Sequence, residues 1–224
     1  MTHIANIEEQ KLMLQQDLHV ITQDYLHKYC TKEVVTSNDH QNYPFLYGKY
    51  ALLTSPIEPS NDIHVILDTF LKFSEYPIVI CGDWKANSYA EVLYEKYNQN
   101  KAIHLLEIIT DHRILNMLRS NCYVFLDAYY QPNNDWSLIE AMYMQLPVIA
   151  YASPYNFNLT SNKAMYYKMP TELLEALKSL HPTKASEIGK SMKEVIHGKI
   201  YTQQHKPENK IMQSSERHHA ANHN

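Results

Sequence analysis

Short apolar runs alternate with amphipathic stretches through most of the chain. Runs of this length are typical of strands buried on both faces of a sheet, and the stretches between them have the spacing of helices. We predict strands at residues 50–54, 77–81, 103–106, 123–127 and 147–151. We predict helices at about residues 63–73, 88–97, 112–120, 137–144 and 171–180. This alternation predicts an α/β fold with a doubly wound parallel sheet.

The two ends of the chain are less regular. At the start we predict an amphipathic helix at 7–16, a strand at 18–22, a helix at 24–29 and a strand at 33–36, with a polar interruption at 37–42. A further helix is expected at 184–197. Residues 203–224 are polar and rich in His, Asn and Gln, and we expect them to be disordered. The predicted division is an N-terminal extension (1–45), a sheet domain (46–200) and a tail (201–224).

Ligands of doubly wound sheets bind at the carboxyl ends of the strands. The segments that follow the predicted strands should therefore meet at one rim: residues 55–56, 82–85, 107–110, 129–135 and 152–155. Five tyrosines are expected at this rim, namely Tyr123, Tyr129, Tyr130, Tyr151 and Tyr155. They either stack on a base or sugar ring, or cover a sheet edge against which another domain would pack.

The most informative stretch is the polar loop that contains Asn134 and Asp135 and opens the predicted helix at Ser137. Free backbone N–H groups at a helix N-terminus can receive an anionic group such as a diphosphate. Glu140 lies one and a half turns further on, where its carboxylate could reach sugar hydroxyls. The alternative is that Asp135 only caps the helix and Glu140 is a solvated side chain. Both interpretations stay open.

Composition excludes several function classes. The net charge is −4 and there are three arginines, which argues against a nucleic-acid partner. The cysteines lie far apart in the sequence and are expected to be reduced, as in a cytoplasmic protein, and the N-terminus lacks the pattern of a signal peptide. The histidines do not have the spacing of a zinc site, so no metal is expected. Gly is scarce, and the phosphate loops of ATPases and dehydrogenases are missing.

Several segments in order resemble the C-terminal, donor-binding domain of GT-B glycosyltransferases of the group-1 and rhamnosyltransferase-like type. The similarity runs from about residue 50 to about residue 180, and residues 18–36 look like the end of a preceding domain. The segments that carry it are Tyr50-Ala51-Leu52-Leu53-Thr54-Ser55-Pro56, Pro77-Ile78-Val79-Ile80-Cys81-Gly82-Asp83, Asp111-His112-Arg113-Ile114-Leu115 and Trp136-Ser137-Leu138-Ile139-Glu140-Ala141-Met142.

This resemblance implies a role for each candidate residue. Backbone amides around Ser137 and Leu138 would hold the donor diphosphate, and Glu140 the donor ribose. Gly82 and Asp83 would line the nucleotide cleft, and the segment from Glu107 to Ile109 would border the base. The donor-binding set is Ser55, Gly82, Asp83, Lys85, Glu107, Ile109, Asn134, Asp135, Ser137, Leu138 and Glu140. Such domains need no metal or other cofactor, and the resemblance identifies no catalytic residue.

The chain departs from the family pattern where the phosphates would be held. The family's Gly-Arg pair falls on Ser55 and Pro56, its lysine falls near Asn61, and its first glutamate falls near Pro132. Lys85 could supply one charge from the neighbouring loop, although an exposed lysine is more commonly just solvated.

Two functions therefore compete. One is a hexosyl-type glycosyltransferase, or its donor-binding part, that transfers a sugar from a nucleotide-diphosphate donor to a glycan or lipid-linked acceptor in surface-polysaccharide synthesis. The other is a non-catalytic half that serves another glycosyltransferase as partner or scaffold. A homo-oligomer or a partner glycosyltransferase chain is expected in either case, because an acceptor domain is not encoded at usable length. A role in surface-polysaccharide synthesis is also compatible with peripheral association of the protein with a membrane.

Overall fold

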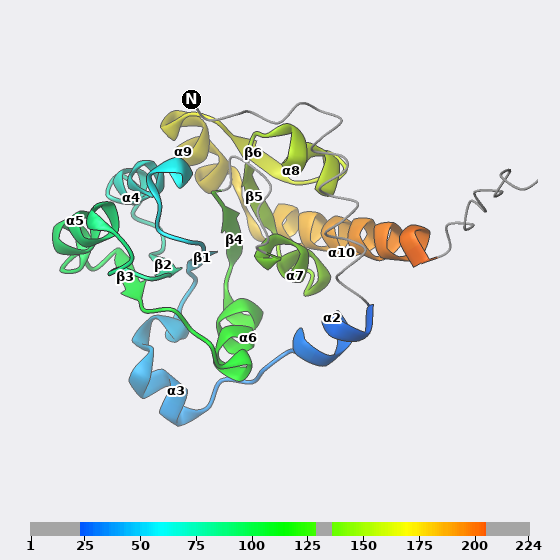
Figure 1. The fold of residues 1–224 in the computed structure, drawn as a ribbon, viewed down its shortest axis with the longest axis horizontal. Coiled ribbons are helices and arrows are strands. Elements are labelled where there is room, and N and C mark those ends of the chain that lie inside the picture. Colours follow the sequence, from blue (N-terminus) through cyan, green and yellow to red (C-terminus); the bar gives the residue numbers. More distant parts are fainter. Residues whose placement is uncertain (1–22, 129–135, 205–224) are drawn as a thin grey trace, which may run out of the picture.

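The computed structural model describes residues 23–128 and 136–204. Within them, neighbouring strands are all parallel and follow the order β3-β2-β1-β4-β5-β6. The strands are β1 (Ala51–Thr54), β2 (Ile78–Cys81), β3 (Ile103–Leu106), β4 (Val124–Asp127), β5 (Val148–Tyr151) and β6 (Met165–Tyr167). The predicted α/β class and doubly wound parallel sheet are confirmed (Figure 1).

The apolar runs in the sequence became strands because both of their faces are covered. Every residue of β1, β2, β4 and β5 is buried, and Leu52 in the central strand lies in register with Val79 and Phe125. Parallel sheets bury both faces, so their strands are apolar without alternation. The edge strands β3 and β6 are only partly buried.

Helices cover both faces of the sheet. Figure 1 shows α4 and α5 on one side and α6, α7 and α10 on the other. Right-handed crossovers require this placement for α4 to α7, which connect strands. The helices after β1 are η2 (Pro59–Asn61), α4 (Ile63–Phe70), α5 (Ser88–Tyr97), α6 (His112–Asn121), α7 (Ser137–Tyr143), α8 (Pro154–Leu159), α9 (Pro170–Ser179) and α10 (Pro182–Gln204). The strand order reverses between β1 and β4, which is where ligands of this architecture bind.

Between residue 23 and β1 lie three short helices: α2 (Gln23–Tyr29), α3 (Ser37–Asn42) and η1 (Pro44–Tyr47). They are packed onto the sheet domain, since Leu26 and Phe45 belong to its buried core. The segment between α2 and α3 runs alongside α6. Asn116 of α6 donates a hydrogen bond to the carbonyl of Tyr29 at 2.6 Å, and Arg113 of α6 pairs with Asp39 of α3 at 2.7 Å.

The strand predicted at residues 33–36 is wrong. This segment is not part of the sheet, and the side chain of Val34 is 83% exposed. The backbone of Glu33 is held by side chains instead: its N–H donates to Ser120 Oγ at 3.1 Å, and its carbonyl accepts from Asn121 at 3.4 Å. Two adjacent valines suggested a strand, but a strand also needs a neighbouring strand, which this segment lacks among the described residues.

The polar interruption predicted at residues 37–42 forms α3. Thr36 and Asp39 make a capping box, in which the Thr36 hydroxyl accepts from the Asp39 N–H and the Asp39 carboxylate accepts from the Thr36 N–H. A capping box satisfies donors that would otherwise be unpaired at the helix start. Its spacing is present in the sequence and was missed because the helix has no apolar face of its own.

Other boundaries differ by smaller amounts. The helix expected at 63–73 ends at Phe70, α8 and β6 had not been predicted, and the helix expected at 184–197 extends from Pro182 to Gln204 and so includes the first residues of the predicted tail. The elements predicted at 7–16 and 18–22, the loop residues Tyr129 to Asp135, and the rest of the tail lie outside the described residues.

Candidate functional site

A cavity of about 530 Å³ opens at the carboxyl ends of β1 and β2. It lies beside the reversal of strand order, and α6 and α7 each contribute one residue to its wall. The lining residues are Thr54, Ser55, Pro56, Ile57, Glu58, Cys81, Gly82, Asp83, Ala86, Ile108, Ile109, Leu115 and Ser137. Five of the predicted donor-binding residues are among them: Ser55, Gly82, Asp83, Ile109 and Ser137.

Gly82 allows the two loops that flank the cavity to approach each other. A Cβ atom at this position would lie 2.6 Å from Ile57 Cδ1 and 2.8 Å from the backbone oxygen of Ser55. Backbone hydrogen bonds hold the loops in this arrangement, because the N–H of Ser55 donates to Cys81 at 3.3 Å and that of Gly82 to Leu106 at 3.1 Å. Glycine is therefore needed here for space, since φ is not positive.

Asn61 holds the loop after β1 in shape. Its side-chain amide donates to the carbonyl of Pro56 at 2.9 Å and to Ser55 Oγ at 3.3 Å, and the residue is buried. This is the position near which the family's phosphate lysine was expected. In this chain it has a structural role, and the loop closes on itself.

Lys85 and Glu107 lie outside the cavity and pair with each other. Lys85 Nζ is 3.4 Å from Glu107 Oε1, and the two side chains are 80% and 61% exposed. Exposed pairs of this kind contribute little to stability, but each partner offsets the other's charge. Asp83 accepts from the backbone N–H of Lys85 at 3.0 Å, which fixes the turn after β2.

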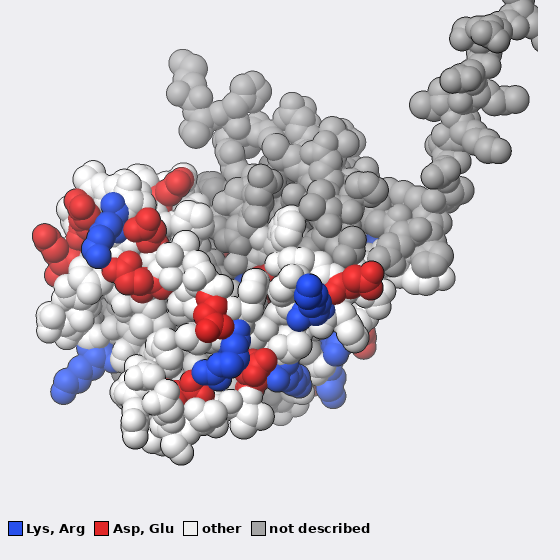
Figure 2. All heavy atoms as spheres, turned by 60° about the horizontal axis from the view of Figure 1, so that its bottom comes forward, with Lys and Arg blue, Asp and Glu red and all other residues white. Residues whose placement is uncertain are grey.

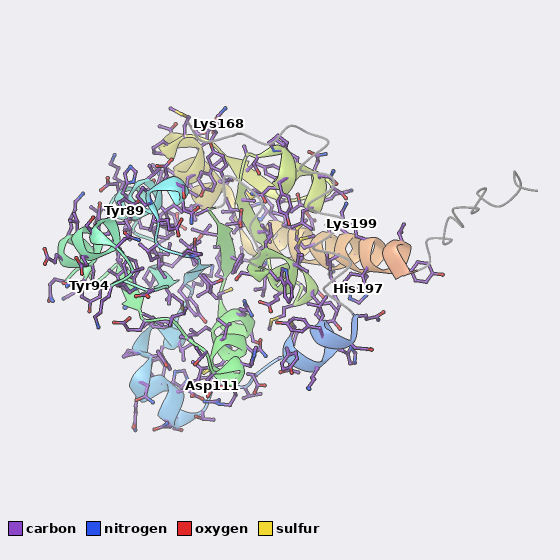
Figure 3. The ribbon with its side chains drawn as sticks, in the orientation of Figure 1. Tyr89, Tyr94, Asp111, Lys168, His197 and Lys199 are labelled. Atoms are coloured by element: carbon purple, nitrogen blue, oxygen red, sulfur yellow. The ribbon has the colours of Figure 1, made fainter. Side chains whose placement is uncertain are left out.

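The loop after β3 gives the cavity an apolar wall. Ile108 is 67% exposed, and Ile109 is partly buried against the core. Leu115 of α6 also lines the cavity. The start of α6 is capped by Asp111 (Figure 3), whose carboxylate accepts from the N–H of Arg113 at 2.8 Å. A flat ring could lie against this wall without needing a charged partner.

Glu140 is buried and already has partners. Its Oε2 lies 2.5 Å from Nη2 of Arg119, which is 2% exposed, and its Oε1 accepts from the Tyr25 hydroxyl at 3.1 Å. Burial, followed by the neighbouring Glu140 charge, raises the pKa of Tyr25 to about 12. Neither Glu140 nor Leu138 lines the cavity; Leu138 is buried in the core.

Arg119 was missed as a member of this region, and so was Tyr25. The signal for Arg119 was its place on α6: it follows Leu115 by four residues and so lies on the helix's apolar side, where an arginine requires an acidic partner. Burial raises the pKa of the Cys81 thiol to about 12, and the charge of Arg119 partly opposes this rise. No local pattern links Tyr25 to Glu140.

A row of aromatic rings joins α2 to the starts of α6 and α7. Tyr25 meets Trp136 edge-on with 5.4 Å between ring centroids, contacts Tyr29 at 4.9 Å, and Tyr29 contacts His112 at 4.9 Å. Tyr25 belongs to this row, and its hydroxyl binds Glu140. The helix α2 therefore packs over the side of α7 on which the glutamate lies.

The predicted ring of tyrosines at the rim is only partly correct. Tyr123 precedes β4 and so lies at the opposite, amino edge of the sheet, where its hydroxyl donates to the carbonyl of Leu180 at 2.7 Å. Tyr151 ends β5 at the carboxyl edge but is buried and packs edge-on against Tyr167, and Tyr155 is buried in α8. These two therefore offer no free ring face at the rim.

Among the described residues, no group of three or more His, Cys, Asp or Glu side chains is placed to hold a metal ion. No helix within residues 23–128 and 136–204 is long and apolar enough to cross a membrane.

Comparison with known proteins identifies a family match over more than half of the chain. Residues 36–164 match the profile described as glycosyl transferases group 1. No curated protein sequence matches the chain.

Solved structures share the fold. Sucrose-phosphate synthase from Thermosynechococcus elongatus is 20% identical, with a TM-score of 0.62 over 76% of this chain and 46% of that one. An Anabaena protein in complex with UDP-glucose is 15% identical, with a TM-score of 0.65 over 80% and 52%. The C-terminal domain of a group 1 glycosyl transferase from Francisella tularensis is 15% identical, with a TM-score of 0.56 over 76% and 95%. This chain thus spans about half the length of the first two.

Proposed function

The chain belongs to the group 1 glycosyl transferase family, and on that premise we propose that it is the donor-binding half of a glycosyltransferase. In this proposal it binds a nucleotide-diphosphate sugar at the carboxyl-edge cavity. A partner chain or a second copy completes the cleft and binds the acceptor. The acceptor is a glycan or a lipid-linked saccharide of a surface-polysaccharide pathway.

The observation that carries the proposal is the position of the cavity. It opens at the carboxyl ends of β1 and β2, where doubly wound sheets bind nucleotides, and five residues expected to contact the donor lie on its wall. The apolar side chains of Ile108, Ile109 and Leu115 suit a base, and Ser137, which also lines the cavity, begins α7. UDP-glucose is bound by the Anabaena neighbour, which has the same fold.

The proposed reaction needs groups that this cavity does not supply. The acceptor hydroxyl forms a bond to C1 of the sugar, the bond from C1 to the diphosphate oxygen breaks, the nucleoside diphosphate leaves with the electron pair, and the hydroxyl proton passes to a base. Stabilising the departing diphosphate requires donors or cations placed where the charge develops. The described cavity wall holds no cation, since its charged residues are Glu58 and Asp83, so we propose that catalysis depends on the partner.

A second function, a non-catalytic half that supports another glycosyltransferase, is favoured by the Arg119–Glu140 pair. The glutamate that would hold a ribose has both oxygens engaged, one by Arg119 and one by Tyr25. A non-catalytic half would keep the fold and the partner surface of a donor-binding domain, but a ligand would no longer reach this carboxylate.

Ligand binding distinguishes these functions. We expect millimolar UDP, GDP or dTDP, or a sugar derivative of one of them, to raise the melting temperature. A ligand at 100 times its Kd adds about 2.7 kcal/mol to the free energy of unfolding. Ala86→Phe should abolish the shift, because Ala86 lines the cavity and is exposed, so a phenyl ring can fill the space without disturbing the core. Val92→Phe, at an exposed position of α5 that does not line the cavity, is the matched control.

The absence of any shift across this panel would reject the donor-binding function and favour the non-catalytic half. A shift that Ala86→Phe leaves unchanged would place the ligand somewhere else. For assembly, we expect light scattering after size exclusion to give a mass above the 26.2 kDa of one chain, either alone or with a partner glycosyltransferase chain. A monomer that turns over donor unaided would contradict the need for a partner.

A further inference from the structure

We propose that the cavity recognises the uncharged ring of its ligand, the nucleoside, and that a diphosphate adds no affinity in this chain by itself. The inference rests on the proposed function, because it concerns the same cavity. It is carried by the charges around the cavity and by how Lys85 and Arg119 are already engaged.

The cavity wall is apolar and acidic. Ile57, Ile108, Ile109 and Leu115 supply most of its large side chains. Its charged members within the described residues are both acids, Glu58 and Asp83, and both are exposed. A diphosphate placed between them would be repelled, because solvent near a protein surface screens the repulsion between like charges only partly.

Among the described residues, Lys85 and Arg119 are each engaged by an acid. Lys85 pairs with Glu107 on the surface, and Arg119 pairs with Glu140 in the interior. Freeing Arg119 for a phosphate would leave Glu140 buried without a counter-charge, which is strongly unfavourable. The sequence of residues 129–135 contains no Lys, Arg or His.

The wider surface also lacks a large basic area on the face that Figure 2 presents. There, acidic and basic side chains are interspersed over the face that includes α3 and α6. Arg113, one of the cations of α6, pairs with the buried Asp39. Long-range attraction would therefore not draw a polyanionic ligand to this face.

The consequence is a ligand held by its ring. The base would lie against Ile108, Ile109 and Leu115, and the phosphates would extend into solvent or toward a partner that provides cations. One charged hydrogen bond to a phosphate oxygen strengthens binding by roughly ten- to a hundredfold. A site without such bonds should bind uridine and UDP with similar affinity.

The test compares uridine with UDP by ligand-observed NMR on the full chain, at low and at high NaCl concentration. We expect the two Kd values to agree within about threefold. Added salt should leave uridine binding unchanged and should not weaken UDP binding, because the charges that UDP meets repel it. A cationic clamp would give the opposite sign, with UDP binding weakened by salt.

A gain-of-function variant makes the test sharper. Pro56 lines the cavity, is exposed, and falls where the family has its phosphate arginine. Pro56→Arg should tighten UDP binding by roughly tenfold and leave uridine binding unchanged. Pro56→Gln, which changes the backbone in the same way without adding charge, should behave like the unmodified chain.

Three results would overturn the inference. If the unmodified chain binds UDP at least about tenfold tighter than uridine, with salt weakening UDP, the diphosphate is recognised and only the proposed function stands. If Pro56→Arg binds UDP no better than Pro56→Gln, charge is not what limits diphosphate binding. If neither uridine nor UDP binds, the inference and the proposed donor site both fail.

Discussion

Replacing Arg119 by Met should destabilise the protein strongly, and the reason lies in the burial of its ion pair. Arg119 is 2% exposed, the Glu140 side chain is 10% exposed, and their charged atoms are 2.5 Å apart. Methionine has a similar length and no charge, so the substitution leaves the Glu140 carboxylate in the interior with the Tyr25 hydroxyl on its other oxygen. Removing one partner of a buried pair costs about 3–5 kcal/mol.

The double variant tells the charge effect apart from lost packing. Arg119→Met combined with Glu140→Gln removes both charges and keeps similar volumes, and replacing a buried pair in this way is often neutral. We expect the double variant to recover most of the stability that Arg119→Met loses. Urea unfolding followed by circular dichroism, with the four proteins of a double-mutant cycle, measures the coupling free energy directly.

The size of the effect makes it easy to detect. For a chain of this length, 1 kcal/mol corresponds to roughly 2–4 °C in melting temperature, so Arg119→Met should melt about 10 °C lower. If the double variant is as unstable as the single one, the loss comes from packing and not from the uncompensated charge. If Arg119→Met loses less than about 1 kcal/mol, the pair behaves as a solvated contact. Arg119 would in that case remain available to a ligand.

Three other substitutions test separate parts of the account. Tyr25→Phe should speed amide hydrogen exchange in α2 and leave α10 unchanged, because it removes the 3.1 Å bond to Glu140; Tyr29→Phe is the control, and equal protection in both variants would contradict the role of Tyr25. Thr54→Val should raise the free energy of unfolding by about 1 kcal/mol, since the buried Thr54 hydroxyl has no partner among the described residues. The same change at Thr160, whose hydroxyl donates to Asn156 at 2.6 Å, should lower it, and two changes of the same sign would be inconsistent with these contacts. Arg113 and Thr36 hold the pKa of Asp39 well below its usual range. The contribution of this carboxylate to the free energy of unfolding is therefore complete above about pH 4 and is lost as pH falls further. Between pH 5 and 2.5 Asp39→Asn should therefore lose less stability than the unmodified chain, and equal losses would contradict the shift.

The sheet could be predicted from the sequence because its signal is local. Each of β1, β2, β4 and β5 is a continuous apolar run, and the helices between them have apolar residues at helical spacing. Elements whose structure depends on distant partners were missed or misread. Residues 33–36 have the composition of a strand but are held by side chains of α6, and α3 depends on a capping box rather than on an apolar face.

The site was predictable to the same degree. Gly82, Ile109 and Ser137 lie on the cavity wall because they follow strands or begin a helix, which topology alone determines. The partners of Glu140 could not be predicted, since Tyr25 and Glu140 are 115 residues apart. The resemblance gave Glu140 a role in which its carboxylate is free, whereas the structure shows both carboxylate oxygens engaged.

The central claim is that a nucleotide occupies the cavity at the carboxyl ends of β1 and β2. The most direct test is a titration of isotope-labelled protein with UDP, followed by amide chemical shifts. The account predicts saturable shifts concentrated at Gly82, Ile109 and Ser137, with α9 and α10 unaffected. An absence of shifts at millimolar UDP, or shifts confined to α9 and α10, would contradict it.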